Sequence, residues 1–104
     1  MKPIAVVTTV ANREDALRMA HALVERKLAA CAQISQIESV YSWKGEVQQE
    51  PELRLLFKTT DERYALVEST IRELHPYELP AIHAFAFEHV YPAYAEWIAE
   101  NAGG

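Results

Sequence analysis

The sequence contains few of the residues that support phosphate binding, disulfide cross-linking or membrane insertion. Its three glycines, Gly45, Gly103 and Gly104, cannot form the glycine-rich loops that cradle nucleotide phosphates. A lone cysteine, Cys31, excludes an internal disulfide and is typical of a reducing compartment. The apolar run at residues 4–7 is too short for a signal-peptide core, and no run approaches the roughly 20 residues that cross a bilayer. We therefore expect a cytoplasmic protein without membrane partners.

Positive charge is also scarce. Ten Lys and Arg residues face fifteen Asp and Glu residues, which gives a net charge of −5, and a surface with that balance repels the phosphate backbone of nucleic acids. Half of the residues are hydrophobic, as in ordinary globular proteins. A chain of 104 residues has a common size for one domain. We expect a single domain over residues 1–104 and no nucleic-acid partner.

Apolar periodicity predicts the first strand and the first helix. Residues 3–10 form an apolar, β-branched run that is typical of a buried strand. A helix is expected to begin at Arg13 behind Asn12, because an Asn side chain accepts from the free amides of a first helical turn. The predicted buried stripe of this helix is Ala16, Ala20, Leu23 and Val24.

Two long strands, at residues 29–43 and 46–59, are predicted to form a hairpin. Lys44 and Gly45 lie between them, and Gly45 can adopt the positive φ that a tight turn requires. Both strands are longer than the usual strand of about 5 to 6 residues. A hairpin of this length is suited to contact another subunit.

Two irregularities are expected within the hairpin. The apolar residues of its first strand change phase, which predicts a bulge near Ser35 and Gln36. Pro51 cannot donate to a ladder, so it predicts an edge, a bulge or a break in the second strand.

The remainder of the chain is predicted to form a helix, a strand and a short terminal helix. The helix is expected to start at a Thr60 or Asp61 cap and to end before Pro76, followed by a strand at 82–90 and a helix from Pro92. The apolar stripe of the helix before Pro76 is Tyr64, Val67, Ile71 and Leu74. The whole order is the ferredoxin-like split βαβ arrangement, an α+β fold (βαββαβ plus a C-terminal helix) with an antiparallel sheet.

More aromatic residues occur in the strands than two helices can cover. In this fold both long helices lie on one face of the sheet, and a large apolar area on the other face is typical of an interface. We therefore predict self-association through Tyr41, Trp43, Phe85 and Phe87.

Candidate chemical groups are few. The serines lie in no nucleophile motif and Cys31 falls in an apolar strand, so we expect no enzyme. His75 at a helix end beside Tyr77 and Glu78 is the best metal-ligand candidate, but one histidine with a carboxylate is half of a copper or zinc site. The hairpin carboxylates Glu46, Glu50 and Glu52 are expected to be solvated, and Arg54, Lys58 and Arg63 either line an anion cleft or pair with those acids.

Five short segments, in this order and spacing, closely resemble the CutA family of divalent-cation tolerance proteins. They are Leu28-Ala29-Ala30-Cys31, Tyr41-Ser42-Trp43-Lys44-Gly45, Lys58-Thr59-Thr60, His75-Pro76-Tyr77 with Pro80, and Pro92-Ala93-Tyr94 with Trp97. The resemblance implies a cytosolic, ferredoxin-like homotrimer similar to the PII signalling trimers. It also implies a link to copper and other divalent cations, with no established enzymatic activity and no required cofactor.

The copper ligands proposed in that family are a first-strand cysteine and two histidines before the Pro-Tyr pair. Here Thr8 and Leu74 occupy two of these positions and only His75 is retained, so at most weak binding of Cu(II) or another divalent cation is expected. One alternative is a PII-like sensor of a small anionic ligand in inter-subunit clefts, with Lys58, Arg54 and Tyr77 as contacts. Another is a trimeric scaffold for a different protein.

Overall fold

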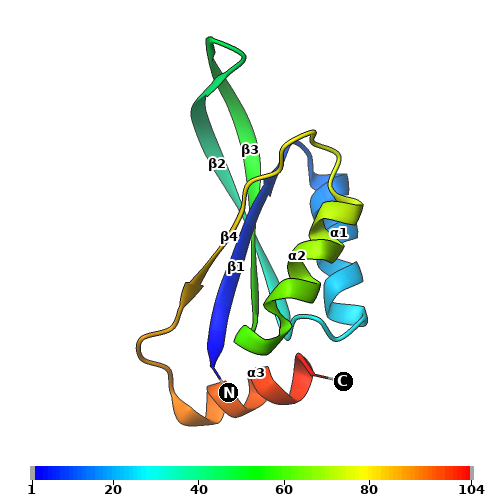
Figure 1. Cartoon of the computed structure of the whole chain (residues 1–104), viewed down its shortest axis with the longest axis vertical. Helices are drawn as coiled ribbons and strands as arrows, with labels where there is room; N and C mark the ends of the chain where they lie inside the picture. The colour runs from blue at the N-terminus through cyan, green and yellow to red at the C-terminus, as the bar shows by residue number, and fades with distance from the viewer. Residues whose placement is uncertain (1, 104) are drawn as a thin grey trace.

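The computed structural model describes residues 2–103 and has an α+β architecture (Figure 1). The strands form one antiparallel sheet in the order β2-β3-β1-β4, which confirms the predicted ferredoxin-like topology. No helix among residues 2–103 is both long enough and apolar enough to span a membrane. The elements are β1 (Pro3–Val10), α1 (Arg13–Glu25), β2 (Cys31–Trp43), β3 (Glu46–Thr60), a 3₁₀ turn (Asp61–Arg63), α2 (Tyr64–Leu74), β4 (Ile82–Ala86) and α3 (Pro92–Asn101).

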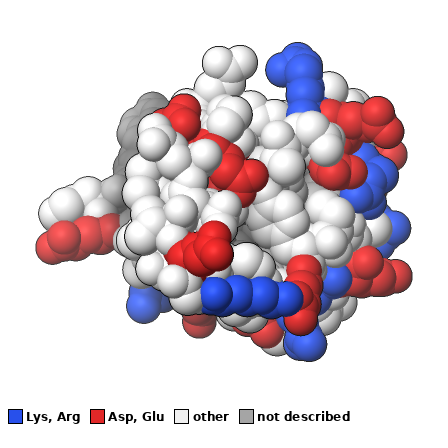
Figure 2. Space-filling view, turned by 90° about the horizontal axis from the view of Figure 1, so that it is seen from above, with Lys and Arg blue, Asp and Glu red and all other residues white. Residues whose placement is uncertain are grey.

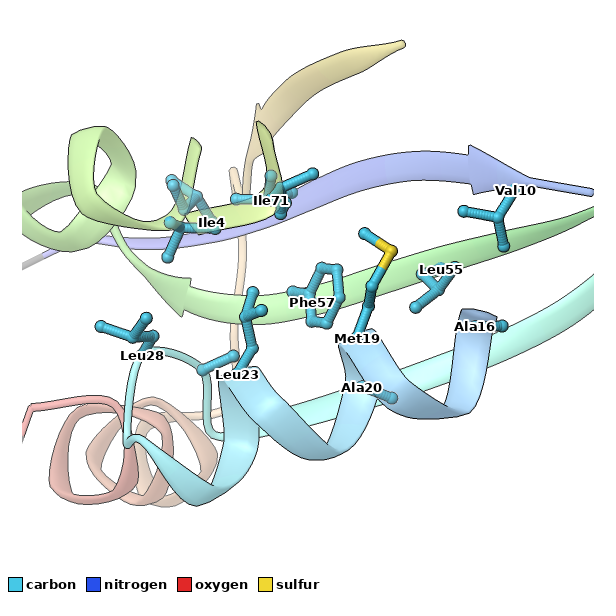
Figure 3. Close-up of a cluster of buried hydrophobic side chains, with 13 residues drawn as sticks. Ile4, Val10, Ala16, Met19, Ala20, Leu23, Leu28, Leu55, Phe57 and Ile71 are labelled. Carbon is cyan, nitrogen blue, oxygen red and sulfur yellow. The ribbon is translucent and has the colours of Figure 1, made fainter. Parts of the chain in front are cut away.

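The core lies between one face of the sheet and helices α1 and α2 (Figure 3). Alternate residues of β1 and β3 point toward the helices, because side chains along a strand alternate between its two faces. The predicted stripe of α2 is confirmed, with Val67 and Ile71 fully buried. The stripe of α1 is partly wrong: Val24 is 37% exposed, and Met19 packs into the core instead. The largest fully buried side chains include Phe57, Met19, Leu23, Leu55, Ile71 and Ile98.

Local signals determine where α1 begins and where α2 ends, but not where α2 begins. Asn12 Oδ1 accepts from the Asp15 amide at 2.9 Å, which confirms the N-cap of α1. The expected cap of α2 is wrong, because a 3₁₀ turn precedes the helix and Thr60 makes no side-chain capping bond. Helix α2 ends at Leu74, and His75 is extended, with φ −76° and ψ 133°, as a residue before proline requires.

The β2–β3 hairpin extends well past both helices (Figure 1). Lys44 and Gly45 have φ of 51° and 82°, which confirms the tight turn. Pairing is unbroken from Cys31–Lys58 to Trp43–Glu46, so the predicted bulge near Ser35 and Gln36 is wrong. The inner half of β2 directs Ala32 and Ile34 toward the helices. The outer half lies beyond the helices, and its large side chains Tyr41 and Trp43 lie on the other face of the sheet. The apolar residues therefore change from even to odd positions along the strand.

The length of β1 determines where β3 becomes an edge and where β4 ends. Strand β3 pairs with β1 only up to the Val10–Leu53 pair. Within residues 2–103, β2 is therefore the only strand beside Pro51, which confirms the predicted edge. Strand β4 ends at Ala86, not at residue 90, because Ala86 pairs with Ile4 at the start of β1. Phe87 then donates its amide to the Pro3 carbonyl.

Thr8 places a hydroxyl in the buried interior of the fold, and its Oγ1 has no hydrogen-bond partner among the described residues. Because an unpaired buried polar group costs about 1 to 3 kcal/mol, Thr8→Val is expected to raise the free energy of unfolding by about 1 kcal/mol, measured by urea denaturation. Thr59→Val is the matched control, since Thr59 is equally buried and donates to the Leu28 carbonyl at 2.7 Å. It should lower stability by about 1 kcal/mol. A loss of stability in Thr8→Val would contradict the prediction.

Candidate functional site

The sheet face opposite α1 and α2 carries large exposed aromatic side chains. Phe85 is 58% exposed on β4, and its ring meets His83 edge-on at 5.2 Å between centroids. Tyr41 and Trp43 extend the same face along the hairpin, 39% and 36% exposed. Phe87, the fourth residue of the predicted interface, lies beyond β4 and packs partly buried against a small cluster around Ile98. We call the surface formed by Tyr41, Trp43, His83 and Phe85 the open face.

The other end of the open face is bordered by α3. Lys58 Nζ donates to the Tyr94 hydroxyl at 3.0 Å and lies 5.1 Å from the centroid of that ring. Tyr94 in turn stacks on Trp97 with an interplanar angle of 9°. Cys31 is paired with Lys58 across β2 and β3 and is half-buried. These contacts fix the Lys58 ammonium near α3.

A cleft of about 1080 Å³ lies between the stem of the hairpin and the segment at residues 76–81 that joins α2 to β4. Its walls are largely apolar and aromatic. Four carboxylates line it, and its lining residues include no lysine or arginine. We call it the hairpin cleft and define it by Glu38, Tyr41, Trp43, Glu50, Glu52, Tyr77, Glu78 and Leu79.

Two tyrosines hold two of these carboxylates in place. Tyr77 Oη donates to Glu52 Oε2 at 2.7 Å, and Tyr41 Oη donates to Glu50. Burial, together with Glu52, raises the pKa of Tyr77 well above its ordinary value, and the hydrogen bond to Glu50 raises the pKa of Tyr41. Both hydroxyls therefore remain protonated donors at neutral pH. The Tyr77–Glu52 bond ties the 76–81 segment to the hairpin.

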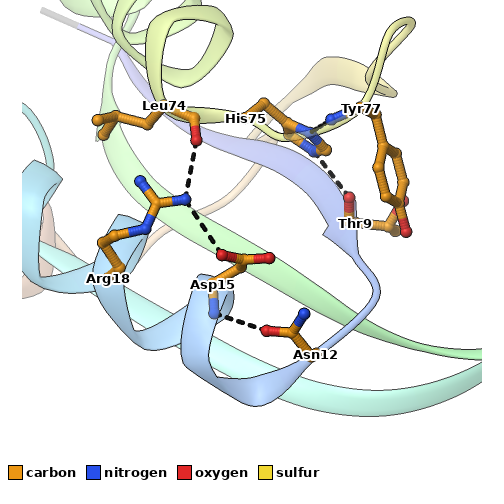
Figure 4. Close-up of polar contacts among 7 residues, drawn as sticks. All are labelled: Thr9, Asn12, Asp15, Arg18, Leu74, His75 and Tyr77. Carbon is orange, nitrogen blue, oxygen red and sulfur yellow. Dashed lines mark hydrogen bonds and ion pairs between the residues drawn. The ribbon is translucent and has the colours of Figure 1, made fainter.

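His75 anchors the start of the same segment (Figure 4). Its Nδ1 accepts from the Tyr77 amide at 3.1 Å, and its Nε2 donates to the Thr9 carbonyl at 2.8 Å. An amide only donates and a carbonyl only accepts, so these partners fix the neutral Nε2–H tautomer. Burial lowers the pKa of His75, in agreement with a neutral ring. Beside it, Arg18 Nη2 bridges the Leu74 carbonyl and Asp15 at 3.0 and 3.2 Å.

The residues that the resemblance assigns to the family's proposed copper-ligand positions do not fit a copper site within one chain. Thr8 is buried among apolar side chains, and Leu74 has no donor atom. Both ring nitrogens of His75 are already bonded to backbone groups. Within residues 2–103, no three His, Cys, Asp or Glu side chains converge on a point that could hold a metal ion. His75 as a ligand stays a prediction.

The three residues predicted to form an anion cleft are not brought together within one chain. Tyr77 contacts Glu52, whereas Lys58 lies six residues further along β3, a distance of about 20 Å at 3.4 Å per residue. Arg54 lies between them and is exposed. Sequence reasoning also treated Glu50 and Glu52 as merely solvated. Glu50 and Glu52 are two residues apart on β3 and so lie on the same face of the sheet as Tyr41, which the sequence pattern could have indicated. The approach of Tyr77 depends on the tertiary fold and could not be predicted from that pattern.

Comparison with known proteins agrees with this architecture. The family model for the CutA1 divalent ion tolerance protein matches residues 4–101. A divalent-cation tolerance protein CutA of Thermotoga maritima is 41% identical over 98 residues, which cover 94% of this chain and 97% of that protein.

Solved structures of similar proteins share the fold closely. The divalent cation tolerance protein of Thermus thermophilus superposes with a TM-score of 0.92 at 39% identity. The match covers 97% of this chain and 99% of the Thermus chain. A protein of Archaeoglobus fulgidus described as the periplasmic divalent cation tolerance protein CutA gives 0.93 at 32% identity, over 96% and 98% of the two chains. With the family model matching nearly the whole chain, this protein belongs to the CutA1 divalent-ion tolerance family.

Proposed function

We propose that this chain is a non-catalytic, cytoplasmic homotrimer that takes part in the response to divalent metal ions. The open face is the observation that carries the proposal. One side of the sheet is buried by two helices, while Tyr41, Trp43 and Phe85 on the other side remain 36 to 58% exposed. An apolar surface of this kind is stabilised when like subunits close around it. The role in metal response and the absence of catalysis rest on the names of the relatives, which describe tolerance proteins.

Sedimentation velocity over a range of micromolar concentrations tests the assembly. The expected species has about three times the mass of one chain of 11.8 kDa. A well-folded species with the mass of a single chain would overturn the proposal.

Any binding of Cu(II) at His75 is expected to be weak, because the metal must replace the Tyr77 amide at Nδ1. Titration calorimetry with Cu(II) is expected to show lower affinity in His75→Ala than in the native chain. His21→Ala is the matched control, since His21 is exposed on α1 and pairs only with Glu25 at 3.1 Å. Equal copper affinity in the two variants would exclude His75 as a ligand.

The charge of the hairpin cleft argues against the alternative function, a sensor of a small anionic ligand. Its lining contains four carboxylates and neither lysine nor arginine, so the local field repels an anion. Lys58 is engaged with Tyr94 at the opposite end of the open face.

A further inference from the structure

We propose that Tyr77 is a positioning residue whose hydroxyl holds the outer hairpin against the body of the fold. The outer hairpin is the part of β2 and β3 that extends past the end of β1, residues 37–52. We call the bond from Tyr77 to Glu52 the brace. This role goes beyond the response to metal ions, and its consequence for assembly rests on the proposed homotrimer.

The outer hairpin has little support of its own. Its two strands pair with each other from Ile37–Glu52 to Trp43–Glu46. Within residues 2–103, no third strand continues the sheet beside them, and both helices end short of them (Figure 1). A two-stranded ribbon is marginally stable by itself. Its position relative to the body therefore depends on contacts outside its own ladder.

The segment that joins α2 to β4 is fixed to the body at both ends. At its start, the His75 ring bonds the Thr9 carbonyl and the Tyr77 amide at 2.8 and 3.1 Å. At its end, Ile82 pairs with Thr8 where β4 begins. The backbone that carries Tyr77 is therefore tied to β1, and its hydroxyl connects β1 to the outer hairpin.

Tyr77 makes the stronger of two contacts between this segment and the hairpin. Within residues 2–103, two polar side-chain contacts join them. Tyr77 Oη donates to Glu52 Oε2 at 2.7 Å, and both residues are half-buried. Lys44 Nζ lies 4.0 Å from Glu78 Oε2 with the two side chains 72% and 75% exposed, so that ion pair contributes little. Because a hydrogen bond to a carboxylate is stronger than one between neutral groups, the brace provides most of the connection.

The negative charge at this end of the molecule makes a donor necessary. Figure 2, seen from the hairpin end, shows acidic side chains separated by uncharged surface. Glu50 and Glu52 on the hairpin and Glu78 on the facing segment line one cleft, whose described lining residues include no lysine or arginine. Like charges repel, so without the Tyr77 hydroxyl these carboxylates favour a hairpin further from the segment. Burial and Glu52 raise the pKa of Tyr77, so the hydroxyl stays a donor at neutral pH.

A braced hairpin lowers the cost of assembly. The outer hairpin carries Tyr41 and Trp43 of the open face, so its position decides where these rings meet a second copy. Holding a segment in its bound position reduces the ordering cost of association. Both partners of the brace belong to one chain, so the brace needs no free cleft in the assembly.

Amide hydrogen exchange of the full chain, followed by mass spectrometry of its peptides, tests the brace. Tyr77→Phe removes only the hydroxyl and should speed exchange in residues 37–52 about 3- to 10-fold, with exchange in β1 unchanged. Glu52→Ala should give the same increase, whereas Glu52→Gln keeps an acceptor oxygen and should stay closer to the native rate. Tyr64→Phe is the matched control, because Tyr64 Oη donates to Glu68 at 2.9 Å within α2. It should leave exchange in the outer hairpin at the native rate.

Three results would overturn the brace. They are native exchange rates in Tyr77→Phe, an equal increase in Tyr64→Phe and Tyr77→Phe, or full additivity of Tyr77→Phe and Glu52→Ala in the double variant. The last result counts because the two variants remove the same bond, and it can be lost only once.

Sedimentation velocity of the same variants separates the brace from the proposed function. In a trimer, Tyr77→Phe should raise the chain concentration at half-dissociation about 3- to 10-fold, and Tyr64→Phe should not change it. A native trimer in which Tyr77→Phe leaves exchange unchanged overturns only the brace. A native single chain whose hairpin exchanges faster in Tyr77→Phe supports the brace and overturns only the assembly. Faster exchange with unchanged half-dissociation of a trimer overturns the consequence for assembly.

Discussion

Replacing Phe85 by glutamate is expected to dissociate the proposed trimer into single chains at micromolar concentration. Phe85 is 58% exposed on β4, and burying a phenylalanine at an interface is worth about 1.5 to 3 kcal/mol. A carboxylate at the same place adds the cost of burying an unpaired charge. Together these terms predict a dissociation constant raised by at least about 100-fold, measured by sedimentation equilibrium.

A matched control separates loss of the interface from loss of the fold. Leu66 is 48% exposed on α2, on the other side of the sheet, so Leu66→Glu should leave the assembly intact. Circular dichroism should show native secondary structure in both variants. A trimer that persists in Phe85→Glu would show that β4 contributes no contact and would remove the open face as the reason for assembly.

Removing the His75 side chain is expected to destabilise the chain strongly near neutral pH. His75 as a residue is only 9% exposed, and its ring makes hydrogen bonds to the backbone at Thr9 and Tyr77. With about 1 kcal/mol for each bond and a further contribution from the buried ring, His75→Ala should lower the free energy of unfolding by about 2 to 4 kcal/mol. Urea denaturation at pH 7.5 measures the loss.

The same residue is expected to make stability depend on pH. Burial lowers the pKa of His75 in the folded chain below its ordinary value of 6.5, against smaller opposing effects of the Thr9 carbonyl, Asp15 and Glu52. The unfolded chain therefore takes up the proton first as the pH falls. The stability that neutral His75 contributes is complete above about pH 6.5 and is lost as the pH falls through the lowered pKa.

The pH dependence provides its own comparison between variants. In His75→Ala the loss of stability between pH 7.5 and 5.5 should be smaller than in the native chain. Identical slopes in His75→Ala and the native chain would show that this ring does not titrate with folding.

Features that depend on neighbours in the sequence could be predicted from the sequence itself. The Asn12 cap, the Lys44-Gly45 turn, the stripe of α2 and the end of α2 before Pro76 all follow from short-range hydrogen bonding, sterics or periodicity. The ordered segments of the chain also indicated the family correctly. These signals are local, and tertiary packing left them unchanged.

Tertiary structure alone decided the remaining features. The phase change in β2 marks the place where the hairpin passes the end of the helices, and the short β4 reflects where β1 begins. The Tyr77–Glu52 and His75–Thr9 bonds join residues that are 25 and 66 positions apart. Periodicity records which side chains share a face of one element, but not how far that element extends past its neighbours or which distant loop crosses it. The hairpin cleft and the neutral state of His75 both arise from those crossings.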